Sequence, residues 1–458
     1  MAHQTHNIPW TILASTLKLK RTNPCQHDAQ NLHVRRAPDQ GKKLTYFTNA
    51  LVRNAVDHAR CDREKYSKQF VSPSDDTIVL ADDIARKIEA TVYRWRLDHQ
   101  SASELGPVEM PHGNGLCPHK EKTAACKCPL PFKERQMCAF RRRYTESPCW
   151  MFFECNDDGF FNIEVMKTLI LYGELDIILP LCADPRVDLK SWWEVSVCGC
   201  VEPDVGWDAI CRLALEAYIV LNVMHCFQST WDDDGSSIEY GCIKVYQQIV
   251  RNCTTSGWSA SDIATYPHRQ FFGIQKGQFT TNYPEPYDKA RWGHLRSARC
   301  STLQYYPYGL MSFNEFRAFE KPFEYQACAN DVSHVRWALC QKGLPVELSN
   351  CILEMASYTA QRRLPFPEEP LHPVNRHELD KYLKYCWQLI VRCTTIGQAL
   401  GMDMEHLLDN MVKKCIQNLF GCACAKLCEE ISDRQEETHG EGNNDGERTI
   451  RGRLVFKK

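Results

Sequence analysis

The chain has 458 residues, enough for two or three domains at about 150 residues each, and its 43% hydrophobic and 24% charged content is that of a folded globular protein. Lys and Arg total 55 against 57 Asp and Glu, which leaves a formal net charge of −2. This balance excludes a strong field toward nucleic acid or an anionic membrane, so neither is expected as a partner.

Residues 1–100 are predicted to form an N-terminal helical region. The first six residues lack a basic stretch followed by a long apolar run, so we expect no secretory signal and a location in the cytoplasm or nucleus. A helix is predicted from Leu44 to Arg60, because Leu44, Phe47 and Leu51 recur at helical spacing on one face. A clearer helix is predicted after the N-cap segment 72–76 and up to about residue 99, where Ile84, Ile88 and Val92 recur at the same spacing.

Residues 101–158 are rich in Cys and Pro and show little periodicity, which predicts an irregular loop or a small cross-linked subdomain. Cys117, His119, Cys126 and Cys128 carry the thiolate and imidazole groups that a structural zinc site needs, and they are the candidate metal ligands. Their one-residue gaps are shorter than is usual for zinc sites, so dispersed reduced thiols are the alternative. In a reducing compartment the 25 cysteines of the chain act mainly as small buried hydrophobes.

Residues 159–335 are predicted to form a central helical and aromatic-rich domain. Its most apolar stretch, Ala217 to Phe227, is about half as long as a membrane-spanning helix and predicts a buried core helix. Aromatic side chains crowd Tyr266 to Tyr308 among glycines and prolines, which indicates irregular loops or short strands. If the chain is an enzyme, this aromatic segment is where we expect its pocket.

Residues 336–428 contain the most regular helical patterns of the chain. Apolar side chains step by three and four residues from Leu379 to Cys393 and again from Met404 to Leu419, which predicts two amphipathic helices. The final segment, 429–458, is predicted to be a disordered charged tail, because residues 429–447 carry eight acidic side chains and too few apolar ones to form a core.

Ahead of these two helices, Leu344-Pro345-Val346-Glu347-Leu348 has the composition of a proline-initiated helix. A proline at the start of a helix costs no hydrogen bond, because its missing N–H would be unpaired there. Leu348, Ile352 and Met355 follow on one stripe of that helix. The alternative interpretation is that the same residues begin an ordinary core helix.

This helix resembles the opening of an F-box, the module by which substrate receptors bind the Skp-type linker of cullin ubiquitin ligases. The resemblance implies that the linker contacts would come from Leu344, Pro345, Val346, Leu348, Ile352 and Leu353. The later F-box pattern is approximated by Leu379, Leu383, Cys386, Trp387 and Leu389, beyond a proline-rich insert at 362–373. Residues 343–395 are also similar to uncharacterised proteins of filamentous fungi.

The sequence therefore predicts a mainly α protein: a multi-helix domain with irregular Cys- and aromatic-rich loops and a C-terminal helical F-box-like module. Its expected function is that of an adaptor or scaffold, as a ubiquitin-ligase substrate receptor if the F-box resemblance extends to function. Two alternatives stay open, an enzyme or accessory factor of unrecognised type and a zinc-organised structural protein. We expect no enzyme, because no nucleophile elbow, phosphate-binding glycine loop or dinucleotide fingerprint is present, and we assign no catalytic residue.

Overall fold

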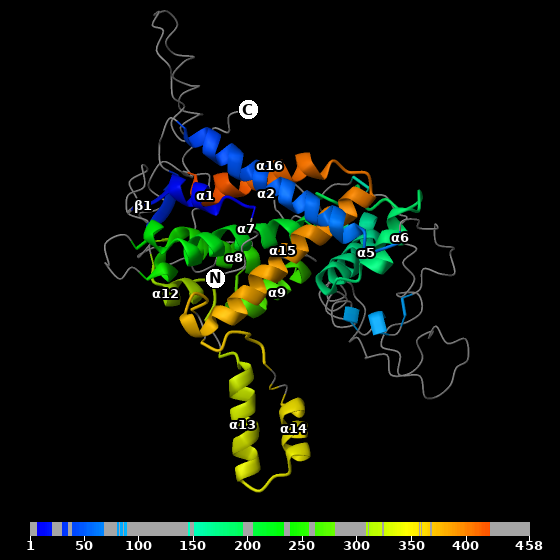
Figure 1. Cartoon of the computed structure of the whole chain (residues 1–458). Coiled ribbons are helices and arrows are strands. Elements are labelled where there is room, and N and C mark those ends of the chain that lie inside the picture. Colours follow the sequence, from blue (N-terminus) through cyan, green and yellow to red (C-terminus); the bar gives the residue numbers. More distant parts are fainter. Residues whose placement is uncertain are drawn as a thin grey trace, which may run out of the picture.

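Helices make up most of the structure of this chain, a computed structural model, and the predicted mainly α class is confirmed (Figure 1). The structure describes residues 7–20, 30–34, 39–67, 80–81, 83–85, 87–88, 145–146, 151–195, 205–232, 239–255, 262–279, 308–309, 311–322, 325–356, 358, 360–366 and 369–421. The elements are α1 (Trp10–Thr16), β1 (Leu17–Lys20), β2 (Asn31–Val34), α2 (Gln40–Arg63), α5 (Phe152–Tyr172), α6 (Leu175–Cys182), α7 (Asp208–Cys226), η2 (Gln228–Thr230), η3 (Tyr240–Cys242), α8 (Lys244–Thr254), α9 (Asp262–Phe272), α12 (Phe313–Arg317), α13 (Ala329–Gln341), α14 (Val346–Met355), η4 (Pro373–Asn375), α15 (Arg376–Ala399) and α16 (Met404–Phe420).

Helix α7 is the centre of the core, as its apolar sequence predicted. It packs on α1, α8, α9, α15 and α16, and 16 of its 19 residues are buried. A helix that is apolar all round has to be covered on every side. Its length and composition would also suit a membrane span, but 83% of its most apolar window is buried inside the protein.

Helix α15 runs beside α7 and α2 and closes the core on a second side (Figure 1). The predicted apolar stripe is confirmed, since Leu379, Leu383 and Cys386 are all buried. Helix α16 follows after a tight turn in which Gly401 has φ +69°, and its own stripe of Met404, Leu408 and Cys415 is buried as well.

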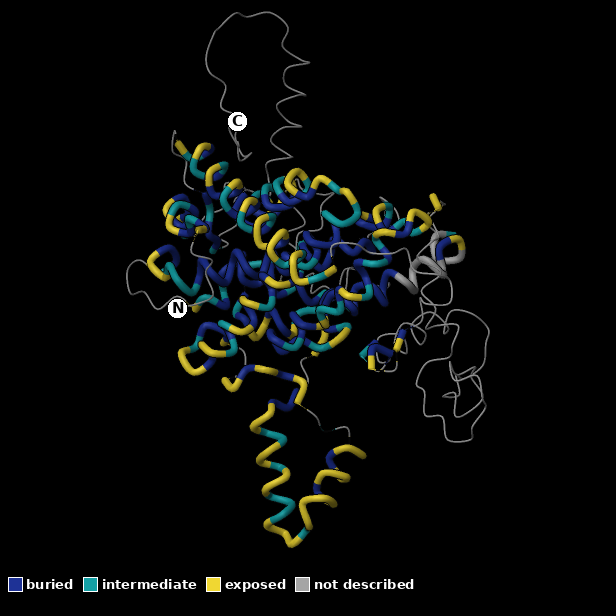
Figure 2. The backbone as a smooth tube through the Cα atoms, turned by 45° about the vertical axis from the view of Figure 1, so that its right-hand side comes forward, coloured by how far each residue is buried: buried dark blue, intermediate teal, exposed yellow. Residues whose placement is uncertain are grey.

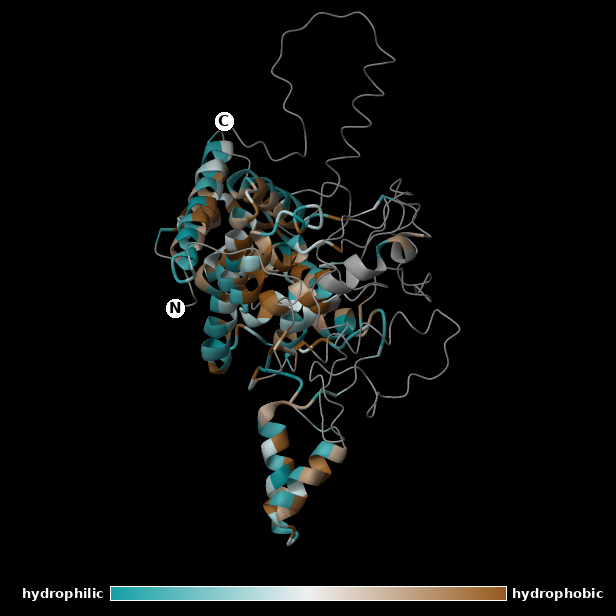
Figure 3. Cartoon of the chain, turned by 90° about the vertical axis from the view of Figure 1, so that its right-hand side faces the viewer, coloured by the Kyte–Doolittle hydropathy of each residue, from teal (hydrophilic) through white to brown (hydrophobic). Residues whose placement is uncertain are grey.

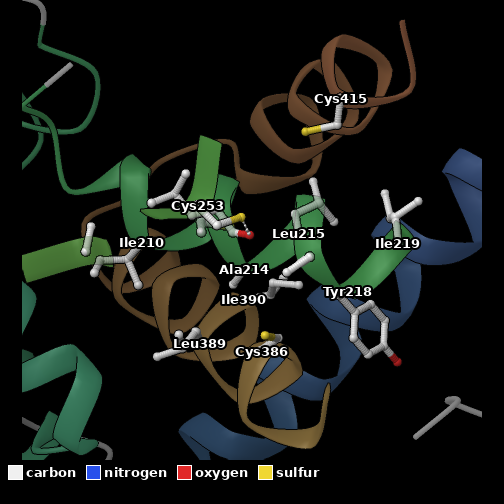
Figure 4. Packing of buried hydrophobic residues seen from close by; sticks show 14 of the residues in the cluster. Ile210, Ala214, Leu215, Tyr218, Ile219, Cys253, Cys386, Leu389, Ile390 and Cys415 are labelled. Atoms are coloured by element: carbon white, nitrogen blue, oxygen red, sulfur yellow. Dashed lines mark hydrogen bonds between the residues drawn. The ribbon is translucent and has the colours of Figure 1, made fainter. Parts of the chain in front are cut away.

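Cysteines fill the spaces between these helices in the way expected of small hydrophobes. Figure 4 shows Cys253 from α8, Cys386 from α15 and Cys415 from α16 surrounding α7. The Cys253 thiol donates to the Leu213 carbonyl oxygen at 3.4 Å, within α7. Every cysteine in the described part of the chain is a free thiol, and the buried ones contribute to the packing of the core.

The N-terminal region departs from the prediction of helices alone, because β1 and β2 pair as antiparallel strands with Leu17 opposite Val34. The strands alternate buried and more exposed side chains at Leu17, Lys18 and Leu19, a period-2 pattern too short to stand out in the sequence. The predicted helix at 44–60 is confirmed as α2.

An aromatic array ties the N-terminal helices to the rest of the core. The Trp10 ring lies 5.4 Å from that of Phe47 in α2 and 5.5 Å from that of Tyr218 in α7, and Tyr218 in turn lies 5.3 Å from Trp387. Residues from α1, α2, α7 and α15 therefore share one core, although more than 300 positions separate the first from the last.

The predicted boundary at residue 336 falls inside α13 and does not divide the chain into two cores. Helices α15 and α16, expected in a C-terminal module, belong to the same hydrophobic core as α7 of the central region. Of the predicted aromatic loops, Tyr266 to Phe272 are helical within α9. All of 280–307 lies outside the described residues, as do the tail 429–458 and most of 101–158.

Candidate docking surface

One helical hairpin, made of α13, the turn at 342–345 and α14, projects from the body in all three views of the chain (Figures 1, 2 and 3). The turn has Gly343 at φ +89°, a left-handed conformation that a residue without Cβ adopts easily. The Gly343 N–H donates to the Cys340 carbonyl oxygen at 3.0 Å and the Leu344 N–H to that of Leu339 at 3.3 Å. Pro345, with φ −57° and ψ 151°, is the N-cap residue directly before α14, so the helix begins one residue later, at Val346.

The two helices bury few side chains between them. Helix α13 has no buried residue, and α14 buries only Ser349 and Leu353. The Ser349 hydroxyl donates to the Pro345 carbonyl oxygen at 3.0 Å and lies 3.6 Å from the Cys340 sulfur. A hairpin with so small an interior leaves most of its apolar surface uncovered.

Backbone contacts at its base hold the hairpin to the body. Cys328, just before α13, forms a parallel bridge with Arg362, beyond α14, and the Gln361 N–H donates to the Ala327 carbonyl oxygen at 2.9 Å. The Arg363 N–H reaches the Gln270 carbonyl oxygen of α9 at 3.1 Å. The two ends of the hairpin are thus joined to each other and to α9.

Side chains reinforce this base. The Cys328 N–H donates to the Asp331 carboxylate at 2.7 Å, and this backbone hydrogen bond is the main cause that lowers the pKa of Asp331. The Tyr325 hydroxyl donates to the same carboxylate, which raises the pKa of Tyr325 to about 12. The Arg362 guanidinium lies 5.3 Å from the centre of the Tyr325 ring. The start of α13 is therefore fixed relative to the strand-like segment that follows α14.

An apolar stripe on α14, formed by Leu348, Ile352 and Met355, faces solvent. The three side chains have exposed fractions of 52%, 41% and 88%, and Val346 at the start of the helix is 47% exposed. Figure 2 shows the hairpin mostly in the colour of exposed residues, and Figure 3 shows hydrophobic residues on it. Contiguous exposed apolar side chains of this kind are typical of binding surfaces.

The six predicted partner-binding residues therefore lie on one element, but they differ in exposure. Pro345, Val346, Leu348 and Ile352 are exposed, Leu344 is half-buried in the turn, and Leu353 is 7% exposed because it faces α13. Binding of a linker would require Leu344, Val346 and Leu348 to face solvent; Val346 and Leu348 do so, whereas Leu344 does so only in part.

Trp337 on α13 is a further exposed apolar residue, with a fraction of 58%, that the sequence analysis did not single out. Its ring lies 5.7 Å from that of His334. Its exposure could have been predicted from its position around the helix. Trp337 is two residues from both Val335 and Leu339, which places it about 200° around the helix from them.

The structure corrects the second half of the predicted F-box pattern. Leu379, Leu383, Cys386, Trp387 and Leu389 are buried in α15, in the core shared with α7, and do not pack beside the Leu344 helix. The Trp387 indole N–H donates to His58 Nδ1 of α2 at 2.9 Å. The physical reason is that an apolar stripe at helical spacing does not specify which surface it will meet.

The candidate zinc ligands Cys117, His119, Cys126 and Cys128 lie outside the described residues. Within the described part, no cluster of three or more His, Cys, Asp or Glu side chains could hold a metal ion. Two open depressions of about 350 Å³ each lie around the start of α16, and Asp403 and His406 line both.

Burial shifts the pKa of two titratable groups in the core toward their neutral forms. Desolvation raises the pKa of the Cys386 thiol to about 12 and lowers that of the fully buried His268 to about 3. His268 Nδ1 lies 2.5 Å from the Tyr382 hydroxyl, and the neighbouring Phe271 ring stacks on Tyr382 at 3.7 Å. None of these groups lines either depression, so they act in packing.

These features define a mainly helical protein whose core is built around α7 and whose exposed apolar surface is concentrated on a projecting hairpin. The chain belongs to the fungal family described as Gramillins biosynthetic cluster protein GRA5, whose profile matches residues 11–428. No curated protein matches the chain. No solved structure matches it either.

Proposed function

We propose that this protein is an adaptor that binds a partner protein through the α13–α14 hairpin. The observation that carries the proposal is the solvent-exposed stripe of Leu348, Ile352 and Met355 on an element that projects from the body. When a partner removes exposed leucine, isoleucine and methionine side chains from water, the complex is stabilised by about 25 cal/mol for each Å² of apolar surface that is buried.

The partner implied by the F-box resemblance is the Skp-type linker of a cullin ubiquitin ligase. The first half of the F-box pattern supports this choice, because Pro345, Val346, Leu348 and Ile352 are available on the surface. With α15 inside the core, the linker would have to be bound by the hairpin alone. A cytoplasmic or nuclear location, expected from the sequence, is required for this interaction.

The family description supports the setting in which the adaptor would act. Its members are named for the gramillins biosynthetic cluster, and an adaptor there would bring a protein of that system to a partner recruited by the hairpin. The body around α7 would then present the second binding surface.

Binding of a purified Skp-type linker to the full chain, measured by calorimetry, tests the proposal. Ile352→Asp is expected to weaken the interaction at least about tenfold, because a carboxylate would be desolvated at the centre of the stripe. Val374→Asp is the matched control, because it also replaces an exposed β-branched side chain with a carboxylate. Val374 lies in η4 on the body and is 62% exposed, so its replacement should leave the affinity unchanged. Absence of binding by the wild-type chain, or equal affinities for wild type and Ile352→Asp, would contradict the linker proposal.

A further inference from the structure

We propose that the α13–α14 hairpin is a hinged arm that pivots as one rigid unit about its base, so that its apolar stripe is presented in more than one direction. The base consists of residues 325–328, which lead into α13, and residues 360–363, which follow α14. The inference concerns the movement of the hairpin, so it can hold with any partner on the stripe and can fail while the docking role stands.

The hairpin lies outside the hydrophobic core built around α7. No described residue from 325 to 356 belongs to that core cluster, and α13 and α14 pack extensively only on each other. Figures 1 and 2 show both helices extending away from the body. Two parts of a chain that share no large apolar interface are expected to move relative to each other. The hairpin and the body meet this condition.

The two helices of the hairpin are tied together at both ends, so they move as a pair. At the turn, the Leu344 N–H donates to the Leu339 carbonyl oxygen at 3.3 Å. At the base, the N–H groups of Gln361 and Arg362 both donate to the Ala327 carbonyl oxygen, at 2.9 and 3.2 Å. Between these ends the helices pack on each other. A movement of the base is therefore transmitted to the whole hairpin.

The base meets the body beside α9. Among the described residues, one backbone hydrogen bond joins the two, from the Arg363 N–H to the Gln270 carbonyl oxygen at 3.1 Å. Leu364, the next residue, is 2% exposed and belongs to the core cluster. The chain therefore enters the core directly after the base, and the hydrogen bond between Arg363 and Gln270 marks the point about which the hairpin can turn.

The side chain of Arg362 sets the direction of the hairpin, because it lies between the body and the start of α13. A Cβ on Gly273, directly after α9, would lie 3.0 Å from Arg362 Cδ, so the aliphatic part of Arg362 packs on the glycine backbone. Its guanidinium lies 5.3 Å from the centre of the Tyr325 ring, and the Tyr325 hydroxyl donates to the Asp331 carboxylate of α13. Tyr325 is 64% exposed, and the contact of a cation with an exposed ring is weak. We therefore expect a second direction of the hairpin in up to about 10% of the molecules.

Double electron–electron resonance on the full chain measures this movement. Nitroxide labels carried by p-acetylphenylalanine leave the cysteines untouched. One label replaces Val346 at the free end of the hairpin, and its partner replaces Val374 in η4 or Tyr46 in α2, all three being exposed. A turn of about 20° moves the end of α13, which is 13 residues or about 20 Å long, by about 7 Å. We expect a main distance and a second population of about 10% that is displaced by about this amount, whereas the pair at 46 and 374 within the body should give one distance.

Arg362→Ala should raise the second population about threefold, because the contact with the Tyr325 ring is lost. Tyr325→Ala removes the ring, leaves Arg362 in place and should have the same effect. Arg376→Ala is the matched control, since Arg376 is exposed at the start of α15 on the body, and it should leave the distances unchanged. A single narrow distance from 346 to both body positions, in wild type and in both base variants, overturns the inference.

A label pair at Asn330 and Val346, the two ends of the hairpin, tests whether it moves as one unit. Their distance should stay single and narrow in wild type and in Arg362→Ala, which also shows that the variant has kept its fold. A distribution for this pair that broadens together with that from 346 to 374 overturns the pivot, because the helices then separate. Since these labels need no partner, linker binding without a second distance refutes the hinged arm alone, and a second distance without linker binding refutes the linker proposal alone.

Discussion

Replacing the buried His268 should remove part of the acid sensitivity of this fold. The side chain is fully buried, and desolvation lowers its pKa to about 3, whereas an unfolded histidine has a pKa of about 6.5. Between these values the unfolded chain binds a proton that the folded chain does not. The free energy of unfolding therefore rises with pH in this range and falls as the solution is acidified.

The size of the effect follows from the unfolded pKa alone at moderate pH. Lowering the pH from 7.5 to 5 should cost about 2 kcal/mol through this one group, because its folded pKa lies well below 5. His268→Asn keeps an acceptor near the position of Nδ1 for the Tyr382 hydroxyl and cannot take up the proton. The variant should be less stable at pH 7.5 but lose about 2 kcal/mol less than wild type on acidification.

Urea unfolding at a series of pH values, followed by tryptophan fluorescence, measures this difference in slope. His377→Asn is the matched control, since His377 is exposed at the start of α15 and its replacement should leave the wild-type slope unchanged. If wild type and His268→Asn lose stability in parallel between pH 7.5 and 5, the assignment of His268 as a buried neutral histidine is wrong.

The remaining predictions separate core from surface. Leu383→Ala, in the buried part of α15, should cost about 2 to 5 kcal/mol of unfolding free energy in urea, whereas Leu348→Ala on the hairpin should change it by less than about 0.5 kcal/mol; similar costs would contradict the division. Trp387→Phe removes the hydrogen bond to His58 and should cost about 1 kcal/mol; its thermal midpoint should fall, and an unchanged midpoint would argue against that contact. Cys351→Ser should remove one rapidly reacting thiol in a colorimetric titration at pH 8 and Cys386→Ala none, because burial and a pKa of about 12 protect Cys386; a fast phase reduced by Cys386→Ala would count against this packing.

Much of the core could be predicted from the sequence, because the amphipathic stripes of α2, α15 and α16 and the apolar second half of α7 each specify what must be buried. Which helix meets which could not be predicted. Leu344 to Leu353 and Leu379 to Leu389 have similar apolar spacing, yet the first lies on a projecting hairpin and the second inside the core. Periodicity identifies a face of a helix but not its neighbour, and this is why the F-box pattern was extended too far.

The turn and the helix start of the hairpin could be predicted from the sequence, whereas the position of the hairpin on the body could not. Gly343 and Pro345 mark the turn and the start of α14, and both have the backbone conformations that their residue types favour. Trp337 escaped notice because it is out of phase with the half-buried Val335 and Leu339 of its own helix. The base of the hairpin depends on contacts between Cys328 and Arg362, which are distant in sequence and carry no local signal.

Photo-crosslinking from the hairpin tests the central claim most directly. A benzophenone amino acid placed at Met355, the most exposed of the stripe residues, should cross-link in cells to a second polypeptide, identified by mass as a Skp-type linker. The same group at Tyr46, exposed on α2 of the body, is the control and should give no such product. Absence of an adduct at 355, or equal adducts at both positions, would contradict a docking role for this surface.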